Sequence, residues 1–462
     1  MKKLWLVVAL VALGGLASRT YADVQNIRLS GDIRLRAYFL DNAGADPVTT
    51  DQAIANTSFI SQRTRVSVEA DLEDHVLVVV TLKAEGLWGA NDEQQITDSN
   101  GDTANGGTAG AGLGRPGGSR INRGWGVGID EAYVQLNEVF YTPATLKIGR
   151  QYLNYGHGLI LSSAEQEYNF DAGRLVLDYY PLTIDLVAAE VVNNQAFAAT
   201  PNKIAGATCG SADLLFVNAR YELTDSIIKN VEAYFGWLAQ GSSGAAGFAS
   251  SRVPPSVNGA SPWIIGARSD VQPADGFQVW LEGAYEGGAN GINDPVNIDA
   301  FLVNVGGRFT MKNTQWTPAI NANYIYASGN FVPWFDYADG YNGYVFAPAL
   351  SNIHIFNLGA SVKPYENTTL SLQGYYYMRA DSDTGVGACP SGANVDFGGL
   401  AFAAQGDGGG LGWEIDTILG YDYSKDVRVQ LVYAAFIPDG AFNKGNADAA
   451  VQEVRGELNV KF

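Results

Sequence analysis

The chain has 462 residues, including 55 glycines, 24 tyrosines and 9 tryptophans, and only 17% of its residues are charged. Its net charge of −19 argues against nucleic acid as a partner, because proteins that bind nucleic acid carry basic fields. A chain of this length would by default form two or three soluble domains, but its glycine and aromatic enrichment, with few helix formers, favours a single all-β architecture.

The first 22 residues have the features of a secretory signal peptide. Lys2 and Lys3 precede an apolar run from Leu4 to Leu16, and the small residue Ala22 lies at the expected cleavage position. The apolar run is shorter than the ~20 residues that a membrane-spanning helix needs, which leaves an uncleaved anchor as the alternative. We predict that residues 1–22 are removed during bacterial export and that residues 23–462 form one β-barrel.

Alternating apolar and polar residues recur from the first segment after the signal peptide to the last. In 26–40, apolar residues such as Ile27 and Leu29 alternate with charged residues such as Arg34 and Arg36. Period-two alternation predicts a strand whose side chains point to opposite faces. About 18 such segments occur, which lies in the range of bacterial outer-membrane barrels. The segments are 26–40, 61–72, 76–89, 128–138, 144–154, 172–180, 182–192, 213–223, 229–239, 262–270, 276–287, 298–311, 316–327, 353–363, 367–379, 411–423, 425–437 and 450–462.

The connections between these segments alternate in length. Those after even-numbered segments are short, as at 73–75, 180–181 and 424–426. Those after odd-numbered segments are long and rich in glycine and small polar residues, and the longest covers 90–126. A transmembrane barrel has short periplasmic turns and long extracellular loops, whereas a soluble sandwich has no reason to sort its loops by parity.

Aromatic residues and the last strand agree with this interpretation. Tyr179, Trp316 and Phe462 fall at the short-turn end, whereas Trp237 and Trp413 fall at the long-loop end, as in the interfacial girdles of membrane proteins. The final segment, "VQEVRGELNVKF", must pair with the first, because an open edge in hydrocarbon leaves backbone groups without hydrogen bonds. Its terminal phenylalanine is typical of chains folded by the outer-membrane barrel assembly machinery. The fold predicted is a transmembrane antiparallel up-and-down β-barrel in the bacterial outer membrane.

The stretch "LKIGRQYLNYGHGLILSSAEQEYNFDAGRLVLDYYP" at 146–181 resembles the alginate-export family of outer-membrane porins. The family's features are a Gly-Arg-Gln strand, a following Tyr-Gly turn, and a Phe-Asp-Gly-type segment with an arginine nearby. The resemblance implies an 18-stranded barrel, which agrees with the number of segments above. The matching residues are Gly149, Arg150, Gln151, Tyr155, Gly156, Phe170, Asp171 and Arg174.

The charged rows of the segments predict the lining of the pore. Arginine suits carboxylate-bearing solutes, because its planar fork can pair bidentately and never loses its charge. The alternative is that these charges form cross-strand ion pairs that brace the wall. Arg150 conflicts with the alternation, which points it at lipid unless a bulge at Gly149 turns it inward. The predicted pore-lining residues are Arg34, Arg36, Arg63, Arg65, Lys83, Lys147, Arg174, Arg220, Arg308, Arg379, Arg428 and Arg455.

Cysteines and histidines are rare. Cys209 and Cys389 both fall in long loops, so they lie on one side of the membrane and form a possible disulfide. With only three histidines and no recognised nucleophile or zinc motif, the sequence predicts neither an enzyme nor a metal site or cofactor.

The sequence therefore predicts a monomeric outer-membrane channel for passive passage of hydrophilic, and in particular anionic, solutes or polysaccharide. Its expected partners are outer-membrane lipid, lipopolysaccharide and the barrel assembly machinery, and nucleic acid is excluded. The length and glycine content of 90–126 predict a plug or lid over the pore. Two alternatives stay open, a general nutrient porin and a structural or adhesin barrel that acts through its outer loops.

Overall fold

The computed structural model gives the course of most of the chain. It describes residues 24–41, 57–72, 75–89, 127–163, 169–192, 212–240, 261–289, 297–329, 331, 334–335, 342–348, 350–381, 394–397, 400–403, 409–439 and 450–462. The predicted signal peptide, the segment 90–126, Cys209 and Cys389 lie outside these ranges.

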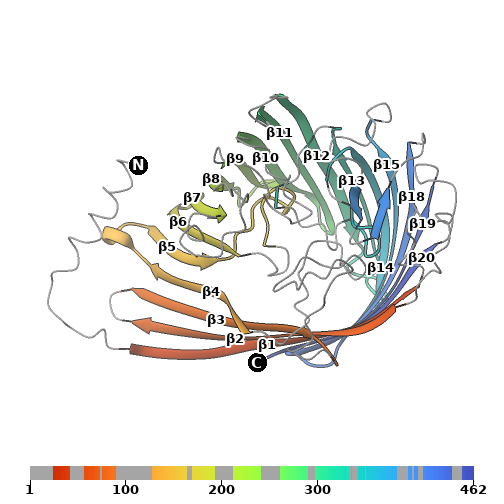
Figure 1. Cartoon of the computed structure of the whole chain (residues 1–462), viewed down its shortest axis with the longest axis horizontal. Helices are drawn as coiled ribbons and strands as arrows, with labels where there is room; N and C mark the ends of the chain where they lie inside the picture. Colours follow the sequence, from red (N-terminus) through yellow and green to blue (C-terminus); the bar gives the residue numbers. More distant parts are fainter. Residues whose placement is uncertain are drawn as a thin grey trace, which may run out of the picture.

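Eighteen antiparallel strands form one sheet, as the alternation predicted (Figure 1). A separate two-stranded sheet pairs β16 (Asn394–Phe397) with β17 (Leu400–Ala403), and a short 3-10 turn, η2 (Val139–Tyr141), precedes β5. The eighteen strands are β1 (Val24–Asp41), β2 (Thr57–Leu72), β3 (Val76–Leu87), β4 (Val127–Leu136), β5 (Ala144–Gln151), β6 (Phe170–Tyr179), β7 (Leu182–Val192), β8 (Ala212–Glu222), β9 (Ile228–Gln240), β10 (Ser261–Ala274), β11 (Phe277–Ala289), β12 (Asn297–Thr310), β13 (Ala319–Ala327), β14 (Ile353–Tyr365), β15 (Thr368–Arg379), β18 (Gly410–Asp422), β19 (Val427–Pro438) and β20 (Val451–Lys461).

The sheet closes on itself between its first and last strands. β1 pairs with β2 on one side and with β20 on the other, in a register that runs from Asp32↔Lys461 to Asp41↔Gln452. Beyond this ladder, Gly31 and Phe462 exchange two backbone hydrogen bonds with N···O distances of 2.8 and 3.0 Å. Closure leaves no open strand edge, which is the condition for a sheet to exist in hydrocarbon.

The two rows of each strand have opposite chemistry. On β1, the side chains of Ile27 and Leu29 are about two-thirds exposed on the outer surface, whereas those of Arg34 and Arg36 are buried on the inner one. Large exposed aliphatic side chains recur on the outer row of nearly every strand. An outer face of this kind is suited to acyl chains, and the inner polar row faces the lumen.

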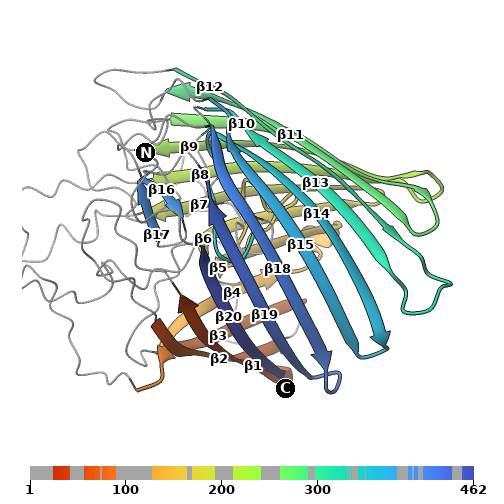
Figure 2. The same cartoon turned by 90° about the vertical axis from the view of Figure 1, so that its right-hand side faces the viewer.

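Long and short connections lie at opposite ends of the barrel, as predicted (Figure 2). At one end the connections range from 290–296, with seven residues, to 88–126, whereas at the other end the longest is 311–318, with eight. The connection 290–296 is therefore the exception to the predicted difference in length. In the described part of the chain no helix is long and apolar enough to cross a membrane.

Aromatic side chains ring the outer face near both ends. Close to the long loops, the ring of Tyr376 packs on Trp413 with centroids 4.2 Å apart, and Trp263 packs on Phe235 at 6.5 Å. At the short-turn end, Tyr179 and Phe462 are exposed. These two belts confirm the predicted girdles and mark the membrane interfaces.

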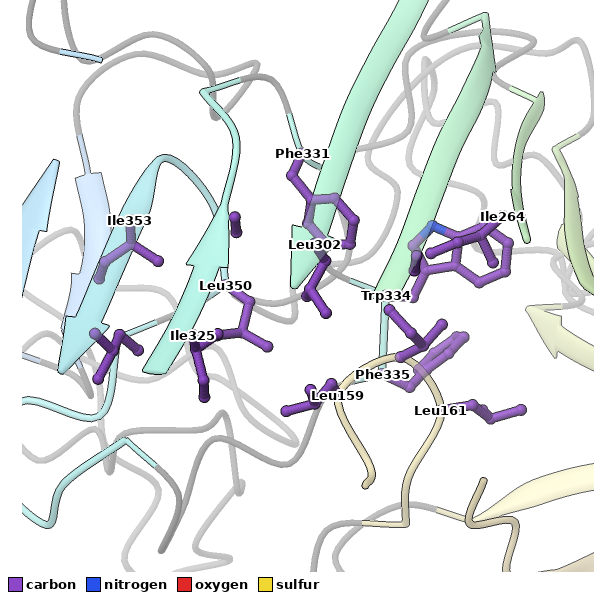
Figure 3. Close-up of a cluster of buried hydrophobic side chains, with 14 of the residues drawn as sticks. Leu159, Leu161, Ile264, Leu302, Ile325, Phe331, Trp334, Phe335, Leu350 and Ile353 are labelled. Carbon is purple, nitrogen blue, oxygen red and sulfur yellow. The ribbon is translucent and has the colours of Figure 1, made fainter. Parts of the chain in front are cut away.

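Two chain segments fold inward from the long-loop end and fill part of the interior. They are residues 152–163, between β5 and β6, and the described parts of 331–350, between β13 and β14. Figure 3 shows their side chains, including Leu159, Leu161 and Trp334, against wall residues such as Ile264 and Leu302. The interior therefore has an apolar core on one side. The predicted strand 144–154 ends early, at Gln151, because the chain turns into the lumen there.

Candidate functional site

Four arginines on β1 and β2 form the densest group of cations on the inner wall. Arg34 and Arg63 are cross-strand partners, and Arg36 and Arg65 lie one inner-row position away on their strands. All four are at most 8% exposed. We refer to Arg34, Arg36, Arg63 and Arg65 as the arginine cluster. The alternation of β1 and β2 places all four on the inner row of these paired strands.

Carboxylates from neighbouring strands surround the arginine cluster. Asp32 accepts from Arg65 at 3.0 Å and from Arg63 at 3.4 Å, and Glu85 lies 3.8 Å from Arg34. Arg36 pairs with Glu457 of β20. These ion pairs offset the cost of taking the guanidinium groups out of bulk water and hold them against the wall.

A β-bulge in β4 adds one more carboxylate that sequence reasoning missed. The register between β3 and β4 shifts after Thr81, so Glu131 faces Thr81, Ile129 faces Leu82, and Asp130 has no cross-strand partner. Asp130 turns inward and is 1% exposed, with its carboxylate 2.7 Å from Arg65 Nε and 3.1 Å from Lys83 Nζ. A bulge re-aims side chains in this way. Two consecutive acidic residues are the only local signal of it in the sequence.

A cavity of about 480 Å³ lies beside the arginine cluster at the short-turn end. Its lining carries six cationic and four anionic side chains. No residue of either inward segment, as far as these are described, belongs to the lining. The cations are Arg34, Arg36, Arg63, Lys425, Arg428 and Lys461, and the anions are Asp32, Asp422, Asp426 and Glu457. Lys425 was not among the predicted pore-lining residues.

The other predicted pore-lining residues are distributed around the wall. Lys147 lies over the ring of Tyr133 at 3.5 Å, and Arg455 is buried beside Glu453 and between the rings of Tyr38 and Tyr344. These contacts hold the two side chains against the wall. The remaining positions are Arg174 against Asp185, Arg220 near Glu222, Arg308 near Ser361, Arg428 against Asp422, and Arg379, which is buried.

Arg150 points away from the lumen. It shares the outer row with Ile148, and its guanidinium makes two hydrogen bonds of 2.9 Å to the Asp171 carboxylate. The β5 register shows no bulge at Gly149. The bidentate pair lies where β5 ends and β6 begins, at the membrane interface, so the charge is neutralised without turning inward.

The inward segment 152–163 is tied to the wall at its tip. The backbone N–H groups of Gly156 and His157 donate to the carboxylates of Glu232 and Glu282, at 3.1 and 2.9 Å. Arg268 donates to the Gly156 carbonyl at 2.6 Å. Gly156 has a φ of +60°, a left-handed conformation that favours glycine, and a Cβ there would lie 2.4 Å from the Glu282 carboxylate.

The imidazole of His157 reinforces this anchor. Its Nδ1 lies 2.9 Å from Glu282 and its Nε2 lies 3.5 Å from Asp270. Burial alone would lower the pKa of His157, but hydrogen bonds to Asp270 and Glu282 outweigh it and raise the pKa above the ordinary 6.5. When protonated, the ring forms ion pairs that hold the segment to β10 and β11.

The second inward segment is held by one carboxylate of β18. Glu414 accepts hydrogen bonds from the backbone N–H groups of Tyr344, Val345 and Phe346, at 2.6, 2.7 and 2.9 Å. The two inward segments also bond to each other, since Phe335 N donates to Ile160 O at 3.0 Å. Both therefore behave as one body within the lumen, fixed to the wall by buried carboxylates.

Comparison with known proteins identifies the family. A model of the alginate export family matches residues 55–456. The chain belongs to this family. No match was found among curated protein sequences.

Solved structures with the same fold come from Pseudomonas aeruginosa. OpdL has a TM-score of 0.55 at 10% identity, with 95% of this chain and 99% of that chain covered. OpdQ gives 0.54 at 14% identity, with 95% and 98% covered, and OccK2 (OpdF) in complex with glucuronate gives 0.53 at 9% identity, with 97% and 99% covered. This member of the alginate export family is thus an outer-membrane β-barrel that forms a channel for solutes. The described part has no group of three or more His, Cys, Asp or Glu side chains suited to hold a metal ion.

Proposed function

We propose that this alginate-export protein passes small carboxylate-bearing solutes by diffusion along the arginine cluster. The observation that carries the proposal is the excess of cations around the 480 Å³ cavity, six against four, at the short-turn end of the lumen. A cationic wall in a confined aqueous space raises the local concentration of anions. Arginines keep their charge when paired, so the cation excess of the cavity lining persists.

The mechanism requires attraction that is weak and repeated. Each guanidinium of the cluster already has a carboxylate nearby, so a passing anion competes for donors and is not held tightly. A channel conducts only if its sites bind well enough to admit a solute and weakly enough to release it. Arg34, Arg63 and Arg428 offer successive donors of this kind along the cavity.

Two features favour small solutes over a polymer. The inward segments occupy one side of the interior, as the buried cluster of Leu161, Phe335 and Trp334 illustrates. The remaining cavity is comparable in size to sites for small ligands. The related fold of OccK2 was solved with glucuronate, a small carboxylate. An anionic polysaccharide remains the second candidate, because the family is described by alginate export.

The rest of the proposal concerns assembly and partners. We propose that cleavage after Ala22 releases a monomeric barrel of residues 23–462, delivered by the barrel assembly machinery that reads the terminal Phe462. Outer-membrane lipid and lipopolysaccharide then surround its aromatic belts. The protein acts as a channel without catalysis, and the segment 90–126 covers the extracellular opening.

Uptake into liposomes tests the proposed function. The rate of D-glucuronate entry is compared with that of D-glucose, a neutral ring of similar size, in vesicles that contain the wild type or an Arg34→Gln, Arg36→Gln, Arg63→Gln variant. We expect the variant to lose several-fold in the glucuronate rate relative to glucose. Arg28→Gln is the matched control, because Arg28 lies on the same row of β1 but does not line the cavity. Equal losses for both solutes would contradict the proposal.

A further inference from the structure

The inner face of β11, β12 and β13 carries a group of residues that the arginine cluster does not involve. Two adjacent inner rows cross these strands. The first contains Trp280, Gly306 and Asn323, which are successive cross-strand partners. The second, one step toward the short turns, contains Gln278, Arg308 and Asn321. An aromatic ring, two amides and a guanidinium thus share one small area of the wall.

Trp280 is unusual among the tryptophans of the described strands. Trp237, Trp263 and Trp413 lie on outer rows and belong to the aromatic belt, whereas Trp280 lies on the inner row with Glu282 and Ala284. A tryptophan in a membrane barrel is expected at the lipid interface. The inward position of Trp280, which is half-buried, is therefore not explained by the lipid interface.

The ring of Trp280 lies flat against the wall. A Cβ at Gly306 would come within 2.4 Å of the indole, so the glycine makes room for the ring to rest on the backbone. The indole Nε1 donates to Asn323 Oδ1 at 2.9 Å, which fixes the ring in this plane. As an inner-row side chain that is only part-buried, the indole is partly open to the lumen. His157 of the inward segment also contacts the indole, at 70° between ring planes and with centroids 6.3 Å apart.

The amides beside the ring form an ordered, half-exposed network. Asn321 Nδ2 donates to Asn357 Oδ1 at 2.9 Å and to Gln373 Oε1 at 3.1 Å. Gly359 makes room for the Gln373 amide, since a Cβ there would lie 2.0 Å from its oxygen. Each amide has two N–H donors and an oxygen with two lone pairs, so the network retains hydrogen-bonding capacity toward the lumen.

We infer that Trp280, Asn321, Asn323 and Gln373 form a binding site for a sugar ring on the lumen wall. The C–H face of a pyranose is electropositive and packs on the negative face of an indole. Its hydroxyl groups both donate and accept, as do the neighbouring amides. Arg308, beside Asn321, is placed to meet a carboxylate on the same ring. The inference rests on the proposed function, because a solute reaches this wall only through the lumen.

Calorimetric titration of the purified barrel in detergent tests the site, with D-glucuronate and cyclohexanecarboxylate as probes. Both are six-membered rings with one carboxylate, and only glucuronate carries hydroxyl groups. We expect Trp280→Ala to weaken glucuronate binding about tenfold, and Trp280→Phe to retain most of it. Asn321→Leu, which keeps the side-chain size, should weaken glucuronate binding about tenfold and leave cyclohexanecarboxylate unchanged.

Trp237→Ala, on the outer row of β9, is the matched control and should change neither titration. Mobility of the unheated proteins on gels verifies that each variant forms the barrel. Equal effects of Trp280→Ala and Trp237→Ala, or parallel losses of binding of both probes in Asn321→Leu, would overturn the site.

Bilayer currents separate this result from the proposed function. Glucuronate binding that depends on Trp280 in a barrel without conductance would support the site and reject the channel. Anion conduction in a barrel whose glucuronate binding does not depend on Trp280 would support the channel and reject the site.

Discussion

Arg36 on β1 and Glu457 on β20 form an ion pair directly across the seam where the barrel closes. Both side chains are largely buried, and both line the cavity beside the arginine cluster. The pair therefore joins the first and last strands and also contributes to the charge balance of the lumen.

Neutralising Arg36 and neutralising Glu457 should shift the ion selectivity of the channel in opposite directions. Glu457→Gln removes one of four anions from the cavity lining and should raise the permeability of chloride relative to potassium. Arg36→Gln removes one of six cations and should lower it. Reversal potentials in planar bilayers measure both effects, and shifts of the same sign in the two variants would refute this assignment.

Loss of the Glu414 carboxylate should release the second inward segment. Glu414→Ala leaves the N–H donors of Tyr344, Val345 and Phe346 without their acceptor, and the two buried ones, of Val345 and Phe346, each cost about 1–3 kcal/mol. We expect larger and noisier single-channel currents than in the wild type. Glu366→Ala, an exposed glutamate in a short turn, is the control and should leave the currents unchanged. A wild-type conductance in Glu414→Ala would show that the carboxylate does not hold the segment.

The anchor at His157 should depend on pH. Because the pKa of His157 is raised in the folded protein, the ion pairs with Asp270 and Glu282 stabilise the segment fully below the ordinary pKa of 6.5. This stabilisation is lost as the pH rises through the raised pKa. Current fluctuations should therefore increase with pH in the wild type. His157→Gln should show the high-pH behaviour at every pH, and an unchanged pH profile in that variant would exclude this role.

Trp334 is the largest fully buried side chain between the inward segments and the wall. Its indole Nε1 donates to Glu286 at 2.9 Å, and its ring is 1% exposed. Trp334→Ala should destabilise the docked segment by about 3–5 kcal/mol, because it removes packing and leaves a cavity. Since the outer wall is unaffected, we expect the variant to migrate as a folded barrel and to show higher conductance. Loss of the barrel itself would mean that the packing around Trp334 is needed for assembly.

The barrel was predictable because its signals are periodic. The alternation in β1 gives the inner arginines and the outer aliphatic row directly, and the parity of the connections gives the two ends. The seam at Phe462 follows from the need to close the sheet. The rows of each strand follow from a short-range pattern, and the closing seam follows from a requirement common to all membrane barrels, that no strand edge is left open.

The interior was not predictable, because it depends on local departures from the pattern. The bulge at Asp130 shifts one residue between rows, and its only local sign is the pair of consecutive acidic residues, Asp130 and Glu131. Residues 152–154 continue the alternation of β5 although the chain there turns into the lumen. The partners of Gly156 and His157 lie on β9 and β11, far away in sequence. The alternation places Trp280 and the interior amides on the inner rows of their strands. The sequence prediction considered only the charged residues of those rows, so these side chains were missed.

Reversal potential of the purified wild-type protein in a planar bilayer, under a gradient of potassium chloride, tests the central claim most directly. The cation excess at the cavity predicts a potential whose sign corresponds to preferred passage of chloride. A potential of the opposite sign, with potassium preferred, would contradict the proposal that the arginine cluster governs passage.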